Sequence, residues 1–473
     1  MTPEEFRDAG HQLIDWIADY RNAVADAPVR AQVAPGDVRA RFPDEAPLDP
    51  APFGDVLQQL DSRVVPGLTQ IQHPMHYGWF PSNATLSSVL GDIATSGIGS
   101  LGISWESCPA LTEVEEVVCE WLRQLTGLSP AWRGAIHDTA SSAMLVAAMV
   151  ARERASGFSK LHGGLQAVDT PLVVYTTDQA HSSVAKAVQM AGFGDHNLRS
   201  VACDPVTRAM RADALADAIA EDTQAGRVPA LVVASCGSTG VTAFDPVDAV
   251  ADVTEAHGLW LHVDAAMAGS ALLLPECRAL FHGVERADSL SWNPHKWLGT
   301  VLDCSLLYVR DTDTLVRVLS TNPSYLQSQA DGQVTQFRDW GIPLGRRFRA
   351  LKLWFHLALD GVAAIQARLR RDLANAAWLA EAVDADPDWE LVAPLTLQTV
   401  SVRHNPPELA LSDAALDAHT LDWVERINAS GEAFLSPATL DGRWFVRVSV
   451  GVESTEREHV EALWALLRRS AAG

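Results

Sequence analysis

The chain has 473 residues, of which 48% are hydrophobic and 20% charged, and its formal net charge is -23 at pH 7. This length exceeds what one hydrophobic core usually organises, so we expect two or three domains. The acidic balance argues against nucleic acids and anionic membranes as main partners, because both attract surfaces rich in Lys and Arg.

Six cysteines are scattered along the chain without a CxxC pair, a pattern that fits neither a zinc site nor a disulfide framework. We therefore expect free thiols in a reducing, cytoplasmic compartment and no bound metal. The N-terminal sequence MTPEEFRDAG lacks the basic start and apolar run of a signal peptide. No stretch approaches the ~18 apolar residues of a membrane span, so the sequence predicts a soluble, unprocessed protein.

The N-terminal segment predicts an amphipathic helix. TPEE at residues 2–5 forms a capping box with proline in the first turn, and apolar residues then recur on one helical face, namely Phe6, Leu13, Ile14 and Ile17. A proline-rich connection follows. Residues 1–84 are therefore interpreted as a helical arm without a core of its own.

Residues 85–360 predict a large α/β domain. Helical patterns alternate with short β-rich runs, which span residues 172–177, 230–235, 259–264 and 289–292. This alternation predicts a mostly parallel sheet covered on both faces, with ligands at the carboxyl ends of its strands. A long amphipathic helix, a strand at 444–450 and a final helix predict a smaller α/β domain over residues 361–473. The basic run GRRFRALK (345–352) is interpreted as the exposed start of a helix, and a functional role is the alternative.

Several residues at predicted strand ends match the needs of an aldehyde cofactor with a pyridine ring and a phosphate. Such a cofactor requires an amine that forms an imine, a carboxylate near the ring nitrogen, a flat group over the ring and N–H donors at a helix N-terminus. Lys296, in SLSWNPHKWLGT, is the candidate amine, and Asp264 ends the run at 259–264. Taken singly, Lys296 could be a snorkelling lysine and Asp264 a turn cap. Together at one edge of the sheet, they favour a role in binding the cofactor.

Other candidates follow the same logic. His181 comes after the strand at 172–177, where an imidazole can lie on a ring or simply cap a helix. Ala140 and Ser141 begin a helix in DTASSAMLVAAMVA, so their groups can bind a phosphate or cap that helix. Ser238, after the strand at 230–235, could reach the cofactor too.

Six motifs in register resemble the group II pyridoxal-phosphate decarboxylases, in particular the aromatic L-amino acid decarboxylases. They are HPMHYGWFPSN, GISWESCPALTEVE, DQAHSS, HVDAAMAGSA, WNPHKWL and IPLGRRFRALKLWF. The resemblance implies pyridoxal 5'-phosphate as cofactor and the type I, aspartate-aminotransferase-like α/β fold. That fold has a large domain with a mostly parallel sheet, a small C-terminal α/β domain and an N-terminal helical arm. The resemblance also implies a homodimer with shared active sites, which would cover the apolar face of the arm.

The resemblance assigns roles to individual residues. Lys296 would bind the cofactor covalently, Asp264 would pair with the ring nitrogen, and His181 would stack on the ring. The phosphate would be held by Ala140, Ser141, Asn293 and His295, with Ser238 and Ala266 packing beside the ring. The substrate pocket would be lined, in part from the partner chain, by Trp79, Phe80, Pro81, Ser82, Leu101, Ile103 and Gly345.

The segment 327–345 is polar and contains glycine, which is typical of a mobile lid. The resemblance implies that Phe337 stands where family decarboxylases carry a tyrosine that protonates the reacting carbon. In one interpretation Phe337 is a packing residue, and another acid, such as His181 or water, completes decarboxylation to the amine. In the other, dioxygen reacts instead and gives an aromatic acetaldehyde, ammonia and hydrogen peroxide, as in the family's aromatic acetaldehyde synthases. Losing a positioned general acid costs ~10²–10⁴ in rate, enough for oxygen to compete.

An aromatic L-amino acid is the expected small-molecule substrate, because the predicted pocket is apolar and Gly345 leaves room in it. An aminotransferase would share Lys296 and Asp264 but would add an arginine such as Arg447, and the motifs favour a decarboxylase. A non-enzymatic cofactor scaffold is disfavoured, since every group expected to face the cofactor is present.

Overall fold

The computed structural model describes residues 1–321, 326, 329–409 and 412–472. The chain divides into two compact units, each considered by itself. One comprises Met1–Pro81, Arg371–Val392 and Gln398–Gly473, and the other comprises Ser82–Arg370 and Ala393–Leu397. The division into an arm, a large domain and a small domain stays a prediction.

The unit around Ser82–Arg370 is built on a seven-stranded sheet, counted over the described residues, in the order β1-β7-β6-β5-β4-β2-β3. Strands β2 to β6 run parallel to one another, whereas β7 runs antiparallel to both β1 and β6. The mostly parallel α/β sheet predicted from the sequence is confirmed. The strands are β1 (Arg133–His137), β2 (Leu172–Thr176), β3 (Leu198–Ser200), β4 (Val228–Ser235), β5 (Trp260–Asp264), β6 (Ser289–Trp292) and β7 (Ser305–Val309).

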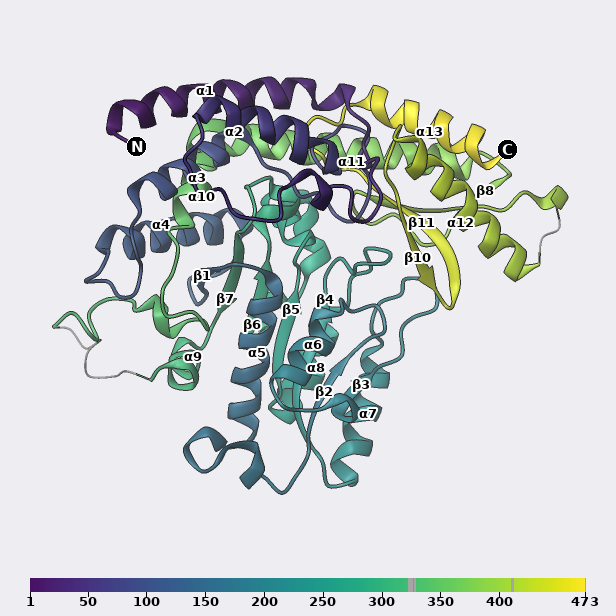
Figure 1. Ribbon diagram of the computed structural model, residues 1–473. Coiled ribbons are helices and arrows are strands. Elements are labelled where there is room, and N and C mark those ends of the chain that lie inside the picture. The colour runs from purple at the N-terminus through teal and green to yellow at the C-terminus, as the bar shows by residue number, and fades with distance from the viewer. Residues whose placement is uncertain (322–325, 327–328, 410–411, 473) are drawn as a thin grey trace. The chain divides into compact units, whose positions relative to one another are not determined.

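Helices flank this sheet (Figure 1). Buried alanines along α5 let that helix lie close to β4–β7, whereas α7 and α8 contact β4. The helices are α3 (Leu86–Ile98), α4 (Pro109–Thr126), α5 (Ala140–Ala155), α6 (Ser183–Met190), α7 (Ala212–Gln224), α8 (Val247–His257), α9 (Thr312–Leu319) and α10 (Ala350–Asp360). Among the described residues, no helix is both long and apolar enough to cross a membrane.

The parallel register brings the carboxyl ends of β4, β5 and β6 side by side. Asp264 of β5 lies between Ser235 of β4 and Ser291 of β6. The ladder continues beyond the strands, because Asn293 donates its N–H to the carbonyl of Ala266 at 2.9 Å. The residues that follow these three strands therefore share one edge of the sheet.

The other unit contains a four-stranded antiparallel sheet, counted over its described residues, in the order β10-β11-β9-β8. The strands are β8 (Trp389–Leu391), β9 (Thr399–His404), β10 (Ser436–Leu440) and β11 (Arg443–Ser449). The helices are α1 (Pro3–Ala23), α2 (Phe53–Gln59), α12 (Asp413–Ser430) and α13 (Arg457–Ala471). Helix α11 (Val362–Asp384) begins in the unit around Ser82–Arg370 and continues into this one.

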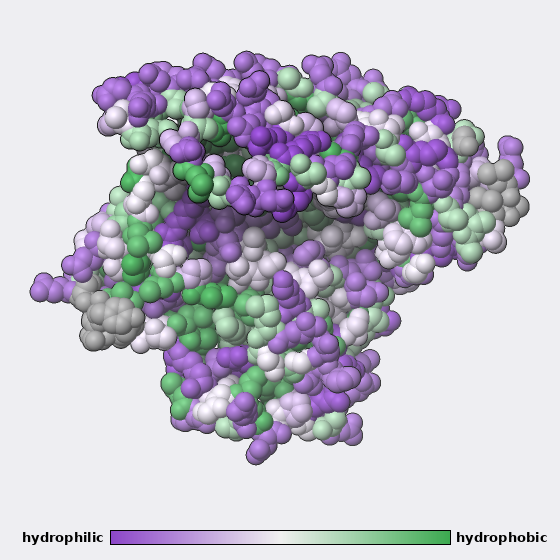
Figure 2. Space-filling view, viewed as in Figure 1, coloured by the Kyte–Doolittle hydropathy of each residue, from purple (hydrophilic) through white to green (hydrophobic). Residues whose placement is uncertain are grey.

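Helix α1 begins with the predicted capping box. Thr2 Oγ1 accepts the N–H of Glu5, and the Glu5 carboxylate accepts the N–H of Thr2. The apolar face of the helix lies on the surface of the single chain, where Phe6 is 65% exposed and Ile14 is 41% exposed. Figure 2 shows that hydrophilic residues predominate around α1 on the visible face.

The run GRRFRALK is not the exposed helix start that the sequence suggested. Arg346 is 8% exposed and Lys352, in α10, is 0% exposed. Lys352 Nζ lies 3.2 Å from Asp92 Oδ1 in α3 and 3.8 Å from Asp303 Oδ1. Gly91 allows this close packing of α3 on α10, since a Cβ there would lie 2.6 Å from Lys352 Cα. The prediction was wrong because the carboxylates that balance these cations come from distant parts of the sequence.

Candidate active site

Lys296 follows β6 in a tight turn, Pro294–Leu298. Its backbone, with φ -99° and ψ -116°, leaves helical geometry within that turn, and its N–H donates to the carbonyl of Asn293 at 3.0 Å. Trp297 and Leu298 beside it are buried. The amine is thus carried on a constrained backbone, next to buried residues of the same turn at the sheet edge.

Asp264 is the last residue of β5, next to β6. Its Oδ1 accepts the N–H of Ala266 at 3.0 Å, which is the capping role considered for it. Among the described contacts, its other oxygen is left available to a cationic group. The carboxylate and the turn that carries Lys296 therefore lie on adjacent strands of one edge.

His181 lies in the connection between β2 and α6. Its Nδ1 accepts the N–H of Ser183 at 3.1 Å, so the neutral ring carries its proton on Nε2. Burial lowers the pKa of His181, the charge of Lys296 lowers it further, and the charge of Asp264 raises it. The strands that precede these residues, β2, β5 and β6, are parallel members of one sheet, so His181, Asp264 and Lys296 lie along one edge although they are far apart in the sequence.

The N-terminus of α5 offers an anion site. Thr139 caps the helix, and its Oγ1 accepts the N–H of Ser142 at 3.4 Å. The N–H groups of Ala140 and Ser141 belong to the first turn, where a helix supplies no internal acceptor. Such N–H groups, together with the helix dipole, favour a phosphate.

Asn293 and His295 are buried and bonded to the start of β7. Asn293 Oδ1 accepts from Ser305 Oγ at 2.6 Å, and His295 Nδ1 accepts the N–H of Cys304 at 3.0 Å. The amide group of Asn293 and the Nε2 of His295 therefore remain as donors. Burial lowers the pKa of His295 to about 4, with the charge of Lys296 adding to the effect, so the ring donates as a neutral imidazole.

Ser238 and Ala266 stand at the same edge, after β4 and β5. Ser238 Oγ accepts the N–H of Ala243 at 3.0 Å, and its own N–H donates to the Ala243 carbonyl at 3.0 Å. The hydroxyl is therefore used in closing a turn. The packing of Ser238 and Ala266 beside a cofactor ring stays a prediction.

The residues at this edge fit pyridoxal phosphate. An amine, a carboxylate and an imidazole lie within electrostatic reach of one another. The acceptor atoms of Asn293 and His295 are already bonded to the protein, so donors are left for a phosphate, as at the first turn of α5. This donor set matches the anionic end of the cofactor, and the amine matches its aldehyde.

Two segments predicted to line the substrate pocket are adjacent. Gly102 and Arg346 exchange backbone hydrogen bonds of 3.0 and 2.9 Å, so Leu101 and Ile103 flank this bridge. A Cβ at Gly345 would lie 3.3 Å from Leu101 Cδ1. Gly345 therefore leaves room beside Leu101, which is 55% exposed. Ser82 belongs to the same unit.

Trp79, Phe80 and Pro81 belong to the other compact unit. There the guanidinium of Arg447, the arginine considered for an aminotransferase, lies 4.7 Å from the Phe80 ring centroid. It also donates to the Trp79 carbonyl at 3.1 Å, and burial lowers its pKa to about 10. A place for these residues in a substrate pocket stays a prediction.

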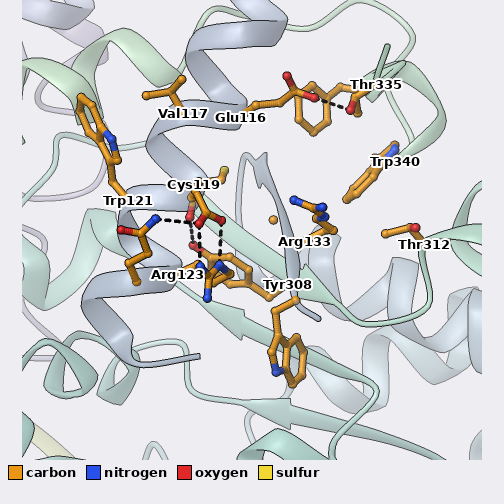
Figure 3. Close-up of a pocket in the computed structure, with 15 residues that line it drawn as sticks. Glu116, Val117, Cys119, Trp121, Arg123, Arg133, Tyr308, Thr312, Thr335 and Trp340 are labelled. Atoms are coloured by element: carbon orange, nitrogen blue, oxygen red, sulfur yellow. Dashed lines mark hydrogen bonds and ion pairs between the residues drawn. The ribbon is translucent and has the colours of Figure 1, made fainter. Parts of the chain in front are cut away.

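Phe337 occupies a core position. Its ring is 4% exposed and packs edge-on against Trp340, with centroids 5.5 Å apart, and the guanidinium carbon of Arg346 lies 4.9 Å from its centroid. The ring also borders a cavity of about 670 Å³ between α4, β1, β7 and α9, shown in Figure 3. None of the predicted cofactor residues is among the described residues that line this cavity. Residues 327 and 328 of the predicted lid lie outside the described residues.

Two residues near the site escaped the sequence analysis, namely Glu115 and Arg346. They form a buried ion pair in which Glu115 Oε1 lies 2.5 Å from Arg346 Nη2. The signal available was a glutamate on the apolar face of the helical pattern TEVEEVVCEWL together with an arginine in GRRFR. Neither pattern identifies the partner.

One protein family and several known proteins are similar to this chain. A family model described as the pyridoxal-dependent decarboxylase conserved domain matches residues 35–405. The chain is similar to phenylacetaldehyde synthase of Arabidopsis thaliana, with 37% identity over 100% of this chain and 97% of that protein. It is also similar to tryptophan decarboxylase 2 of Oryza sativa subsp. japonica, with 37% identity over 100% and 95% of the two chains. The crystal structure of Oryza sativa TDC with PLP and tryptamine matches with a TM-score of 0.97 and 37% identity, covering 100% of this chain and 98% of that chain.

Proposed function

Because the chain belongs to the pyridoxal-dependent decarboxylase family, we propose that it removes the carboxyl group of an aromatic L-amino acid, with pyridoxal phosphate as cofactor, and releases the arylalkylamine and carbon dioxide. The observation that carries this proposal is the convergence of Lys296, Asp264 and His181 at one sheet edge. Aromatic substrates are supported by relatives named tryptophan decarboxylase and tyrosine decarboxylase.

Each residue of the edge has a chemical task. When bound, pyridoxal phosphate supplies an aldehyde and a ring that accepts electrons as carbon dioxide leaves. Lys296 would supply the amine that holds the aldehyde, and Asp264 would keep a proton on the ring nitrogen. His181 would hold a proton at Nε2 that it can give to the substrate. The phosphate would be bound by the backbone N–H groups of Ala140 and Ser141, the Asn293 amide and the neutral His295 ring.

The core position of Phe337 supports the amine as the product. Its ring fills space beside Trp340 and Arg346, which is a packing role, so a missing hydroxyl there removes no proton donor from the sheet edge. The alternative product, an aromatic acetaldehyde with ammonia and hydrogen peroxide, has support from the similarity to phenylacetaldehyde synthase. The two products differ in whether dioxygen is consumed.

The test is to incubate the holoenzyme with phenylalanine, tyrosine, tryptophan and their hydroxylated forms, with and without air. We expect equal amounts of carbon dioxide and amine in both atmospheres. Aldehyde and peroxide formed in air would favour the alternative product. If no aromatic amino acid releases carbon dioxide, the proposed function is wrong.

We further propose a cytoplasmic homodimer with shared active sites. Exposed apolar side chains of α1 and α3 support it, since a single chain leaves Phe6, Ile14, Leu86, Leu90 and Ile93 in contact with water. The six cysteines are free thiols, as in a reducing compartment. Analytical ultracentrifugation of the active enzyme tests the dimer, and full activity of a monomer would contradict it.

A further inference from the structure

A buried ion pair outside the predicted catalytic residues joins three segments of the unit around Ser82–Arg370. Glu115 of α4 is 1% exposed, and its Oε1 lies 2.5 Å from Nη2 of Arg346, which is 8% exposed. Taking such a pair out of water is costly, so a pair of this kind contributes mainly through the positions it fixes.

The pair holds the end of strand β1. Ile136 donates its N–H to Glu115 Oε1 at 2.8 Å, and its carbonyl accepts from Arg346 Nη2 at 2.8 Å. Both backbone groups of Ile136 are therefore bonded to one ion pair. The chain then reaches Thr139, the N-cap of α5, within three residues. The pair is thus anchored on the end of β1, and the place of that strand in the sheet is fixed separately by its pairing with β7.

The backbone of Arg346 holds a predicted wall of the substrate pocket. Gly102 exchanges two backbone hydrogen bonds with Arg346, and a Cβ at Gly102 would lie 2.6 Å from Leu111 Cδ1 and 3.2 Å from the Arg346 carbonyl oxygen. The fit leaves no space between the two segments. Leu101 and Ile103 are therefore placed by Arg346.

The side chain of Arg346 also reaches the segment that carries Phe337. Its guanidinium carbon lies 4.9 Å from the ring centroid of Phe337, in the range of a cation–π contact. Gln336, the preceding residue, accepts the N–H of Trp105 at 3.0 Å, which ties this segment to the same pocket wall. One arginine thus contacts the β1 end, the pocket wall and the base of the predicted lid.

We propose that Glu115 and Arg346 are positioning residues that hold the substrate-pocket wall, Leu101–Ile103 with Gly345, at a fixed place relative to the end of β1. This inference rests on the proposed function, because it treats that wall as a wall of the aromatic substrate pocket. Among the described contacts, neither residue touches Lys296 or Asp264. Loss of the pair therefore weakens substrate binding and leaves cofactor attachment intact.

The main test is Glu115→Gln in the holoenzyme. The substitution keeps the shape of the side chain and its acceptor for Ile136, and it removes the charge that holds Arg346. We expect kcat/KM for the aromatic substrate to fall by up to about 100-fold, the loss that a misplacement of about 1 Å can produce, and to fall mainly through a higher KM. The affinity for pyridoxal phosphate and the visible absorbance of the holoenzyme should stay unchanged. Arg346→Lys, which keeps the charge but loses the paired geometry, should raise the KM by less.

A matched control exists in the same unit. Glu153 is also 1% exposed, pairs with Arg152 at 2.7 Å and accepts the N–H of Lys160 at 2.8 Å. Glu153→Gln therefore reports the general cost of weakening a buried ion pair. We expect it to lower the melting temperature about as much as Glu115→Gln does while leaving the KM unchanged. The double variant Glu115→Gln/Arg346→Gln should raise the KM no further than Arg346→Gln alone, because both changes break one interaction.

Hydrogen–deuterium exchange gives a readout that does not depend on activity. In Glu115→Gln, peptides covering residues 100–108 and 334–348 should exchange faster than in the parent, and in Glu153→Gln they should not. An unchanged KM together with unchanged exchange in Glu115→Gln would overturn the positioning role. If the exchange responds as expected while the parent releases no carbon dioxide from aromatic amino acids, the proposed function fails and the positioning role stands.

Discussion

Two lysines in the unit around Ser82–Arg370 are surrounded by protein in different ways. Lys352 is fully buried, whereas Lys296 is only partly buried. Lys352 lies within 3.2 Å of Asp92 and 3.8 Å of Asp303, so carboxylates balance its charge. Lys296 lies near two imidazoles and lowers the pKa of both His181 and His295. The two lysines therefore differ in their neighbours more than in the depth of their burial, and those neighbours support Lys296 as the proposed reactive amine.

The two lysines act together on one residue. Burial lowers the pKa of His295 to about 4, and the charges of Lys296 and Lys352 both contribute. His295 is therefore kept neutral between Lys296, the proposed catalytic amine, and Lys352, which is paired with carboxylates. A neutral His295 ring with its proton on Nε2 can donate a hydrogen bond to a phosphate. It adds no second positive charge beside Lys296.

The largest expected difference between the lysines is in catalysis. Lys296→Ala removes the amine that holds the cofactor, so turnover should fall by several orders of magnitude and the visible absorbance of the holoenzyme should disappear. The melting temperature of the apoprotein should change little, because the turn is held by backbone hydrogen bonds. Absorbance spectra and carbon dioxide release measure both effects. Full turnover in this variant would remove Lys296 from the mechanism.

For Lys352 the expected effect is on stability. Asp92→Asn leaves this fully buried ammonium with Asp303 as its remaining carboxylate, at 3.8 Å. Removing one partner of a fully buried pair costs about 3–5 kcal/mol. Because the Asp92 side chain is 24% exposed, we expect a smaller loss, which urea denaturation of the apoprotein would detect. The folded fraction of the variant should still bind pyridoxal phosphate with the parent's absorbance. A loss of the cofactor band without a loss of stability would reverse the roles assigned to the two lysines.

A third difference is expected in the pH dependence of stability. The pKa of His295 is about 4 in the folded protein and about 6.5 in an unfolded chain. Between these values the unfolded chain binds a proton that the folded protein does not, so the free energy of unfolding falls as the pH drops from about 6.5 to about 4. For this one group the slope reaches about 1.4 kcal/mol per pH unit, and above pH 6.5 the group has no effect.

His295→Gln is expected to reduce the slope of the free energy of unfolding against pH by up to about 1.4 kcal/mol per pH unit, the contribution of one proton. Glutamine keeps a donor and an acceptor but does not titrate. Urea denaturation of the apoprotein between pH 4.5 and 7.5 measures the slope. Buried His137 and His262, whose pKa values burial also lowers to about 4, keep a slope in the variant. His257→Gln, at an exposed position, serves as the control. Equal slopes for His295→Gln and the parent would show that His295 is not held neutral.

Much of the fold and of the site follows from local sequence patterns. The strands β2, β4, β5 and β6 lie within two residues of their predicted ranges, because buried parallel strands give continuous apolar runs. Lys296, Asp264 and His181 could be grouped because parallel strands end at the same edge. The pairs Glu115–Arg346 and Asp92–Lys352 could not be predicted. Arg346 and Glu115 are 231 residues apart, and ion pairs at such separations leave no periodic trace.

The neighbours of Phe337 also indicate its role, and the smallest expected effect on stability and product is that of Phe337→Tyr. Phe337→Tyr adds a hydroxyl to a ring that is 4% exposed and packed on Trp340. The ring borders the cavity of about 670 Å³ described above, which has room for an added hydroxyl. Stability should therefore change by no more than about 1 kcal/mol, and the amine should remain the product.

A second variant, Tyr325→Phe, distinguishes the two possible positions of a protonating phenol. Of the five tyrosines in the sequence, four have their hydroxyls next to Gln70, Met75, Asp222 or the Cys119 carbonyl, whereas Tyr325 lies outside the described residues, just before the predicted lid. If a phenol of this segment protonates the reacting carbon, Tyr325→Phe should lower amine formation ~10²–10⁴-fold and produce aldehyde and peroxide in air. Phe337→Tyr should do neither. Aldehyde and peroxide from the parent enzyme, replaced by amine in Phe337→Tyr, would instead place residue 337 at the reacting carbon, against its core position.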